Sequence, residues 1–80
     1  MVDVTSVEIV RDRTVRLQFA DGSTRTVDLR PFLWGPAFER IAHDDEFFGQ
    51  VRVDEEIGTI VWPNGADLAP ALLHSGATKA

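Results

Sequence analysis

The stretch that decides the fold lies near the end of the chain and reads Ile57-Gly58-Thr59-Ile60-Val61-Trp62-Pro63-Asn64-Gly65-Ala66-Asp67-Leu68. Residues 59–62 are β-branched or aromatic, which is typical of a strand. Pro63 ends that strand or confines it to the edge of a sheet, because it has no backbone N–H to donate. Asn64-Gly65 is a strong turn dipeptide, since both residues tolerate positive φ. The stretch therefore predicts a strand, a tight turn and the beginning of a last helix.

The residues after the turn predict how that helix starts. The carboxylate of Asp67 is expected to accept a backbone N–H of the first turn and to favour the positive helix end. Pro70 then falls in the first turn, where its missing N–H costs little. Trp62 is expected in the core. We interpret the following residues as one structural motif: Trp62, Pro63, Asn64, Gly65 and Asp67.

The same motif carries a resemblance to a known family. Trp62-Pro63-Asn64-Gly65-Ala66-Asp67, preceded by Gly58-Thr59-Ile60, resembles bacterial domain-of-unknown-function family 2442. The likeness extends to Phe19-Ala20-Asp21-Gly22 and covers the chain from Val4 to Leu73. The resemblance implies a single α+β domain and supplies no established activity. Domains of this family look like partners of another small domain in toxin–antitoxin-like pairs.

Composition limits the classes of protein to consider. Eighty residues allow one domain, and a chain of this size buries only about 60% of its unfolded surface. The chain has no cysteine, which excludes disulfides and thiolate zinc sites. There is no apolar run of about 20 residues and no signal-peptide pattern, so a cytoplasmic location is the expectation. The net charge of −5 disfavours nucleic acid and membrane surfaces and favours a basic protein partner.

The hydrophobic pattern gives the order of elements. Strands are predicted at 4–10, 15–19 and 23–29, where apolar residues alternate with polar ones. A short helix at 37–42 and a further turn capped by Asp44 follow. The remaining elements are strands at 51–53 and 57–62 and a helix at 68–74. We predict an α+β domain over residues 1–74, with an antiparallel sheet in the order β-β-β-α-β-β-α, helices on one face, and a flexible tail at 75–80.

Catalytic and metal sites are weakly supported by the residue types present. Asp67 with His74 or His43 could form an acid–base pair, but no cysteine and no serine in a nucleophile elbow accompanies them. Adjacent side chains at His43-Asp44-Asp45 point about 100° apart on a helix, so a solvated helix end is favoured over a metal site. Asp54-Glu55-Glu56 lacks the spaced ligands of a calcium loop. We therefore predict a protein that is not an enzyme and has no catalytic residue, cofactor or metal.

Arginines in the first strands give one alternative function. Arg16 and Arg25 are expected on the outer face of one hairpin, where they could serve a DNA-associated regulator as a β-ribbon. A solvated sheet face, or a contact with an acidic partner, explains the same residues. The negative net charge favours the solvated face.

Trp34 gives the leading hypothesis. It lies in a loop stiffened by Pro31 and Pro36, and its indole either folds onto the core or lies at a contact between chains. Phe32 and Leu33 can fill the core side of this loop. We therefore predict that Trp34, with Phe32, lies in the interface of a homodimer or a hetero-complex. The protein is then a non-enzymatic interaction module, such as the acidic antitoxin-like partner of another small protein.

Overall fold

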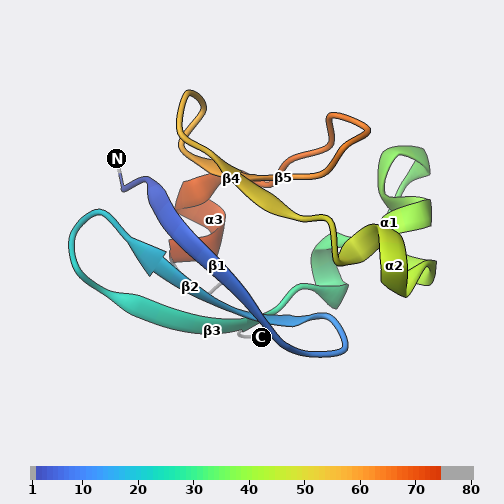
Figure 1. Cartoon of the computed structure of the whole chain (residues 1–80), viewed down its shortest axis with the longest axis horizontal. Coiled ribbons are helices and arrows are strands. Elements are labelled where there is room, and N and C mark those ends of the chain that lie inside the picture. Colours follow the sequence, from blue (N-terminus) through green and yellow to red (C-terminus); the bar gives the residue numbers. More distant parts are fainter. Residues whose placement is uncertain (1, 75–80) are drawn as a thin grey trace.

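A three-stranded antiparallel meander forms the first part of the fold. The computed structural model describes residues 2–74, so the tail predicted at 75–80 lies outside the described residues. The strands are β1 (Val4–Arg11), β2 (Thr14–Phe19) and β3 (Thr24–Asp28), with β2 in the centre (Figure 1). The Asp-Gly turn between β2 and β3 forms as predicted, because the carboxylate of Asp21 accepts hydrogen bonds from the backbone N–H and the hydroxyl of Ser23.

A second hairpin follows the central helices. Strands β4 (Arg52–Asp54) and β5 (Thr59–Val61) pair with each other as a separate two-stranded sheet. The backbone N–H of Val4 donates to the carbonyl of Gly58 over 2.9 Å, which holds this hairpin against the start of β1. The α+β class and the order of strands and helices are therefore confirmed, and the strands are divided between two sheets.

The helical segments are short. Two 3-10 helices, η1 (Arg30–Phe32) and η2 (Pro36–Phe38), lead into α1 (Glu39–His43), α2 (Asp45–Phe48) and, after the second hairpin, α3 (Pro70–His74). The predicted capping role of Asp44 is confirmed, since its carboxylate accepts the N–H of Phe47 over 3.1 Å. The helix predicted at 37–42 starts later than expected because Pro36 opens a 3-10 turn first.

The predicted capping role of Asp67 is wrong. Helix α3 begins at Pro70, so Asp67 lies too early in the chain to be its N-cap. The reason is that the backbone around Asp67 stays extended against β5, where Asp67 and Val61 form an isolated antiparallel β-bridge. On either side of this bridge, the N–H of Trp62 donates to the carbonyl of Ala66, and the hydroxyl of Thr59 donates to the carbonyl of Leu68. Strand pairing therefore outcompetes an earlier start of the helix. Pro70 does occupy the first turn, as predicted.

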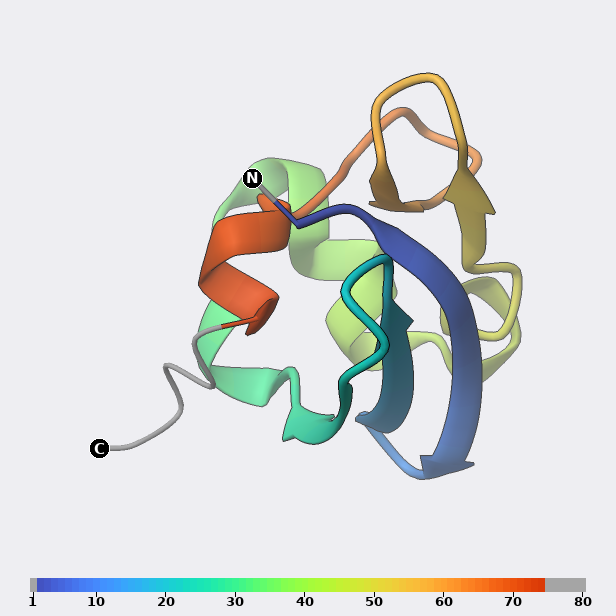
Figure 2. The same cartoon turned by 90° about the vertical axis from the view of Figure 1, so that its left-hand side faces the viewer.

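The core lies between the three-stranded sheet and the helices, which all cover one face of that sheet (Figure 2). Register explains this arrangement, because Val15 pairs with Val27 and both point inward, whereas Arg16 pairs with Thr26 on the solvated face. Trp62 is buried, and its indole N–H donates to the carbonyl of Phe48 over 3.1 Å. The largest fully buried side chains come from the strands, from the helices and from residues directly next to them: Val15, Leu17, Leu29, Ile41, Phe48, Ile60, Trp62 and Leu73.

Candidate functional site

Trp34 is the most exposed large apolar side chain of the described residues, with 76% of its surface open to solvent. It lies in the link between η1 and η2. The preceding Leu33 is buried and fixes the backbone, and Pro36 starts the next 3-10 turn directly after Gly35. The indole is therefore held out from a loop that is anchored on both sides.

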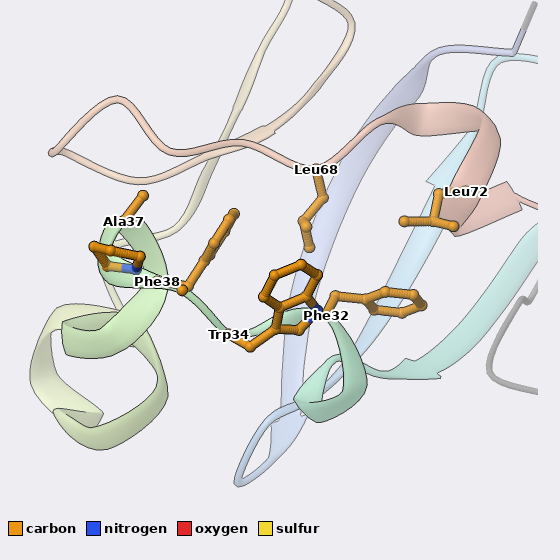
Figure 3. A pocket seen from close by; sticks show the side chains of 8 residues that line it. Phe32, Trp34, Ala37, Phe38, Leu68 and Leu72 are labelled. Carbon is orange, nitrogen blue, oxygen red and sulfur yellow. The ribbon is translucent and has the colours of Figure 1, made fainter.

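An apolar pocket opens beside this indole (Figure 3). It has a volume of about 430 Å³ and lies between the 3-10 segment and the start of α3. Figure 3 shows the Trp34 ring between Phe38 on one side and Phe32 and Leu72 on the other. We call the following residues the apolar pocket: Phe32, Trp34, Ala37, Phe38, Leu68 and Leu72.

The Trp62–Asp67 motif supports the wall of the apolar pocket. The side-chain amide of Asn64 donates to the carbonyl of Ala37 over 3.0 Å, and its oxygen accepts the N–H of Ala66 over 3.1 Å. The Phe38 ring packs edge-on against Trp62, with 6.3 Å between the ring centroids. The Trp62–Asp67 motif thus positions Ala37 and Phe38, which line the apolar pocket together with Trp34.

A second pocket, of about 470 Å³, also includes Trp34. It is lined by Leu33, Pro36, Glu39 and His43 as well, and we call it the Glu39 pocket. Within residues 2–74 the Glu39 carboxylate forms no ion pair and no side-chain hydrogen bond. Trp34 therefore stands where an apolar pocket meets one that contains a free negative charge.

The predicted arginine surface does not form. Arg16 and Arg25 lie on opposite faces of the sheet, because Arg16 pairs with Thr26 while Arg25 pairs with Leu17 and paired residues share a face. The expectation that both lie on one outer face is therefore wrong. Successive side chains of a strand point to opposite faces, so a shift of the pairing by one residue moves a side chain to the other face of the sheet. Arg16 is also neutralised by Glu8 at 2.6 Å.

Arg13 is buried, which sequence reasoning missed. Its guanidinium donates to the carbonyls of Ile41 and Ala42 over 3.1 and 2.9 Å, lies 2.8 Å from the Asp45 carboxylate and stacks over the Phe48 ring. These contacts hold the C-terminal end of α1 against the β1–β2 turn. Nothing in the pattern distinguished Arg13 from the exposed arginines around it, since a charged residue in a turn is normally solvated.

The proposed acid–base residues are not brought together. His74 pairs with Asp21 at 3.1 Å and packs edge-on against Phe19. Hydrogen bonds from Ser23, reinforced by His74, lower the pKa of the Asp21 carboxyl to about 2. Asp67 and His43 are both exposed, and within residues 2–74 neither side chain forms a hydrogen bond or an ion pair with His74.

Residues 2–74 contain no group of three or more His, Asp or Glu side chains arranged to hold a metal ion. The helices in this part of the chain are all too short or too polar to cross a membrane.

A comparison with models of protein families shows to which family this chain belongs. A family model described as "Protein of unknown function (DUF2442)" matches residues 4–79. The chain belongs to the DUF2442 family. The predicted family is thus confirmed, and the match covers the strands and helices of residues 4–74 of this DUF2442 domain. No curated protein and no solved structure matches the chain.

Proposed function

We propose that this DUF2442 domain is a non-enzymatic module that binds another protein through Trp34 and the apolar pocket. The observation that carries the proposal is the exposure of Trp34 on an anchored loop beside an apolar pocket. A buried tryptophan removes about 150–250 Å² from water, and tryptophan is enriched among residues that dominate binding energy. A chain of 80 residues has little apolar surface to leave unused.

The rigidity of the loop supports the same proposal. Leu33 is buried, and the side-chain amide of Asn64, in the turn after β5, donates a hydrogen bond to the backbone carbonyl of Ala37. A side chain held in place before binding loses less entropy on binding than a mobile one. Trp34 therefore retains more of the free energy of its burial for association.

The finer proposal concerns the kind of complex. The net charge of −5 fits the acidic member of a pair of small proteins, as in a toxin–antitoxin-like complex. The acid–base alternative has less support, because His74 is engaged with Asp21. The DNA-binding alternative has less support too, because Arg16 and Arg25 lie on opposite faces of the sheet.

Affinity capture from the native host tests the proposal. The full chain, Trp34→Ala and a control, Ile57→Ala, serve as baits; Ile57 is also an exposed apolar residue but lies in the β4–β5 turn. We expect Trp34→Ala to weaken association at least about 30-fold, equivalent to about 2 kcal/mol. Its melting midpoint should remain near that of the parent. Equal capture by all three baits would contradict the proposal, as would a Trp34→Ala variant that unfolds.

A further inference from the structure

The two pockets around Trp34 together define the chemistry of a partner. Resting on the proposed function, we propose that the site binds a cationic amphipathic segment of a different protein. One large apolar side chain of that segment occupies the apolar pocket, and a lysine or arginine side chain occupies the Glu39 pocket. Both partner side chains then contact the Trp34 indole, because Trp34 contributes to both pockets.

The first pocket requires an apolar anchor. All six residues that define it are apolar, and its volume of about 430 Å³ accommodates a leucine or an aromatic side chain. A polar group placed among Phe32, Phe38 and Leu68 would lose its hydrogen bonds to water without gaining partners. The apolar pocket thus selects for an aliphatic or aromatic residue.

The second pocket requires a cation. Glu39 is its charged lining residue at pH 7, with His43 counted as neutral, and the Glu39 carboxylate has no ion-pair partner within residues 2–74. The neighbouring Arg40 does not neutralise Glu39, since it is held by Asp44 and lies over the Phe47 ring. A guanidinium or ammonium group in this pocket can meet the carboxylate and the indole together, and aromatic faces attract cations.

The charge of the whole domain favours the same occupant. With a net charge of −5 the domain attracts a cationic segment and repels a second copy of itself. Asp67, which directly precedes Leu68 of the apolar pocket, is exposed and adds to the negative charge nearby. A foreign basic segment is therefore preferred over self-association at this site.

Three synthetic amphipathic helical peptides of equal length test the inference. One presents leucine and arginine, the second leucine and glutamate, and the third serine and arginine. Binding to the full chain is followed by calorimetry and by the NMR signal of the Trp34 indole N–H. We expect the leucine–arginine peptide to shift this signal and to bind at least about tenfold more tightly than the other two.

Matched variants separate a specific contact from general attraction. Glu39→Gln and Glu46→Gln remove the same charge from exposed carboxylates, but only Glu39 lines the pocket beside Trp34. Glu39→Gln should weaken the leucine–arginine peptide about five- to tenfold, and Glu46→Gln less than twofold. Equal effects of the two variants, equal binding of the leucine–glutamate peptide, or no Trp34 shift with any peptide would each overturn the inference.

Two outcomes distinguish this inference from the proposed function. Capture that depends on Trp34 but not on Glu39 leaves the protein-binding role in place and refutes the cationic segment. Concentration-dependent dimerisation that Trp34→Ala abolishes makes a second copy of this chain the occupant, and it refutes the cationic segment as well. Sedimentation of the wild-type chain over a range of concentrations measures this directly.

Discussion

Replacing the buried Arg13 with methionine should lower the free energy of unfolding by about 2–4 kcal/mol. Methionine keeps much of the apolar stem but leaves the carbonyls of Ile41 and Ala42 without their donors. An acceptor left without a partner costs about 1–3 kcal/mol when buried, and the lower part of that range applies to Ala42 because it is only half-buried. The lost stacking of the guanidinium on Phe48 adds about 0.5–1 kcal/mol.

The ion pair of Arg13 with Asp45 contributes little to this sum. Asp45 is 92% exposed, so water replaces the guanidinium as its partner after the substitution. A domain of this length has a total stability of roughly 4–12 kcal/mol, at about 0.05–0.15 kcal/mol per residue, so the loss from Arg13→Met is a large share of the whole. Arg13→Lys should give an intermediate loss, because one ammonium cannot reproduce the two directed donors.

Urea unfolding followed by the buried Trp62 measures the effect. The control is Arg16→Met, which removes an arginine of the same hairpin whose ion pair with Glu8 is exposed, and it should cost less than about 1 kcal/mol. The slope of the free energy against urea should be the same for both variants. Equal unfolding midpoints for Arg13→Met and Arg16→Met would refute the structural role of Arg13.

Three further predictions follow from local geometry. Gly65→Ala should destabilise the fold by about 1–2 kcal/mol through backbone strain alone, because Gly65 has a φ of +88° and no atom lies within 4 Å of an added Cβ. An unchanged urea midpoint would contradict this prediction. Asp44→Ala should lower the free energy of unfolding by about 1 kcal/mol through loss of the α2 cap, whereas Asp67→Ala should change it by less than about 0.5 kcal/mol. A larger loss for Asp67→Ala than for Asp44→Ala in urea titrations would restore Asp67 as a cap. The pKa of Asp21 is lowered to about 2 from an ordinary value near 3.8, so the contribution of its carboxylate to folding stability is complete above pH 4 and is lost as the pH falls towards 2. The melting temperature of Asp21→Asn should therefore fall less over this pH range than that of the parent.

Local signals in the sequence predicted most of the fold. The Asp21-Gly22 turn and the alternation of Val15 and Leu17 with polar residues were sufficient to predict the meander, because turn chemistry and period-two burial act over a few residues. The caps were harder to predict. Asp44 and Asp67 are the same residue type before apolar residues, and only the pairing of Asp67 with Val61 shows that one caps a helix and the other does not.

The candidate site was predicted only in part. The sequence left two positions open for Trp34, in the core or at a contact between chains, and the exposure of its side chain excludes the first. The apolar pocket did not follow, because Leu68 and Leu72 reach it from the far end of the chain, and one sequence does not reveal such distant contacts. The faces of the sheet on which Arg16 and Arg25 lie depend on the pairing register of β2 and β3, and an error of one residue in that register reverses the prediction.

The bond between Val4 and Gly58 has a consequence for how the chain acquires its structure. Pairs within the meander join residues close in sequence, so little loop entropy opposes them and they are expected to form early. The N-terminal end of β1 instead forms its hydrogen bond with Gly58, which lies far along the chain. Because Gly58 has no side chain, the carboxyl group of Asp3 can occupy the space beside it. Until Gly58 is synthesised, one end of the first strand has no hydrogen-bonding neighbour on that side. Closing this end is thus a late step that joins the beginning of the chain to its last hairpin.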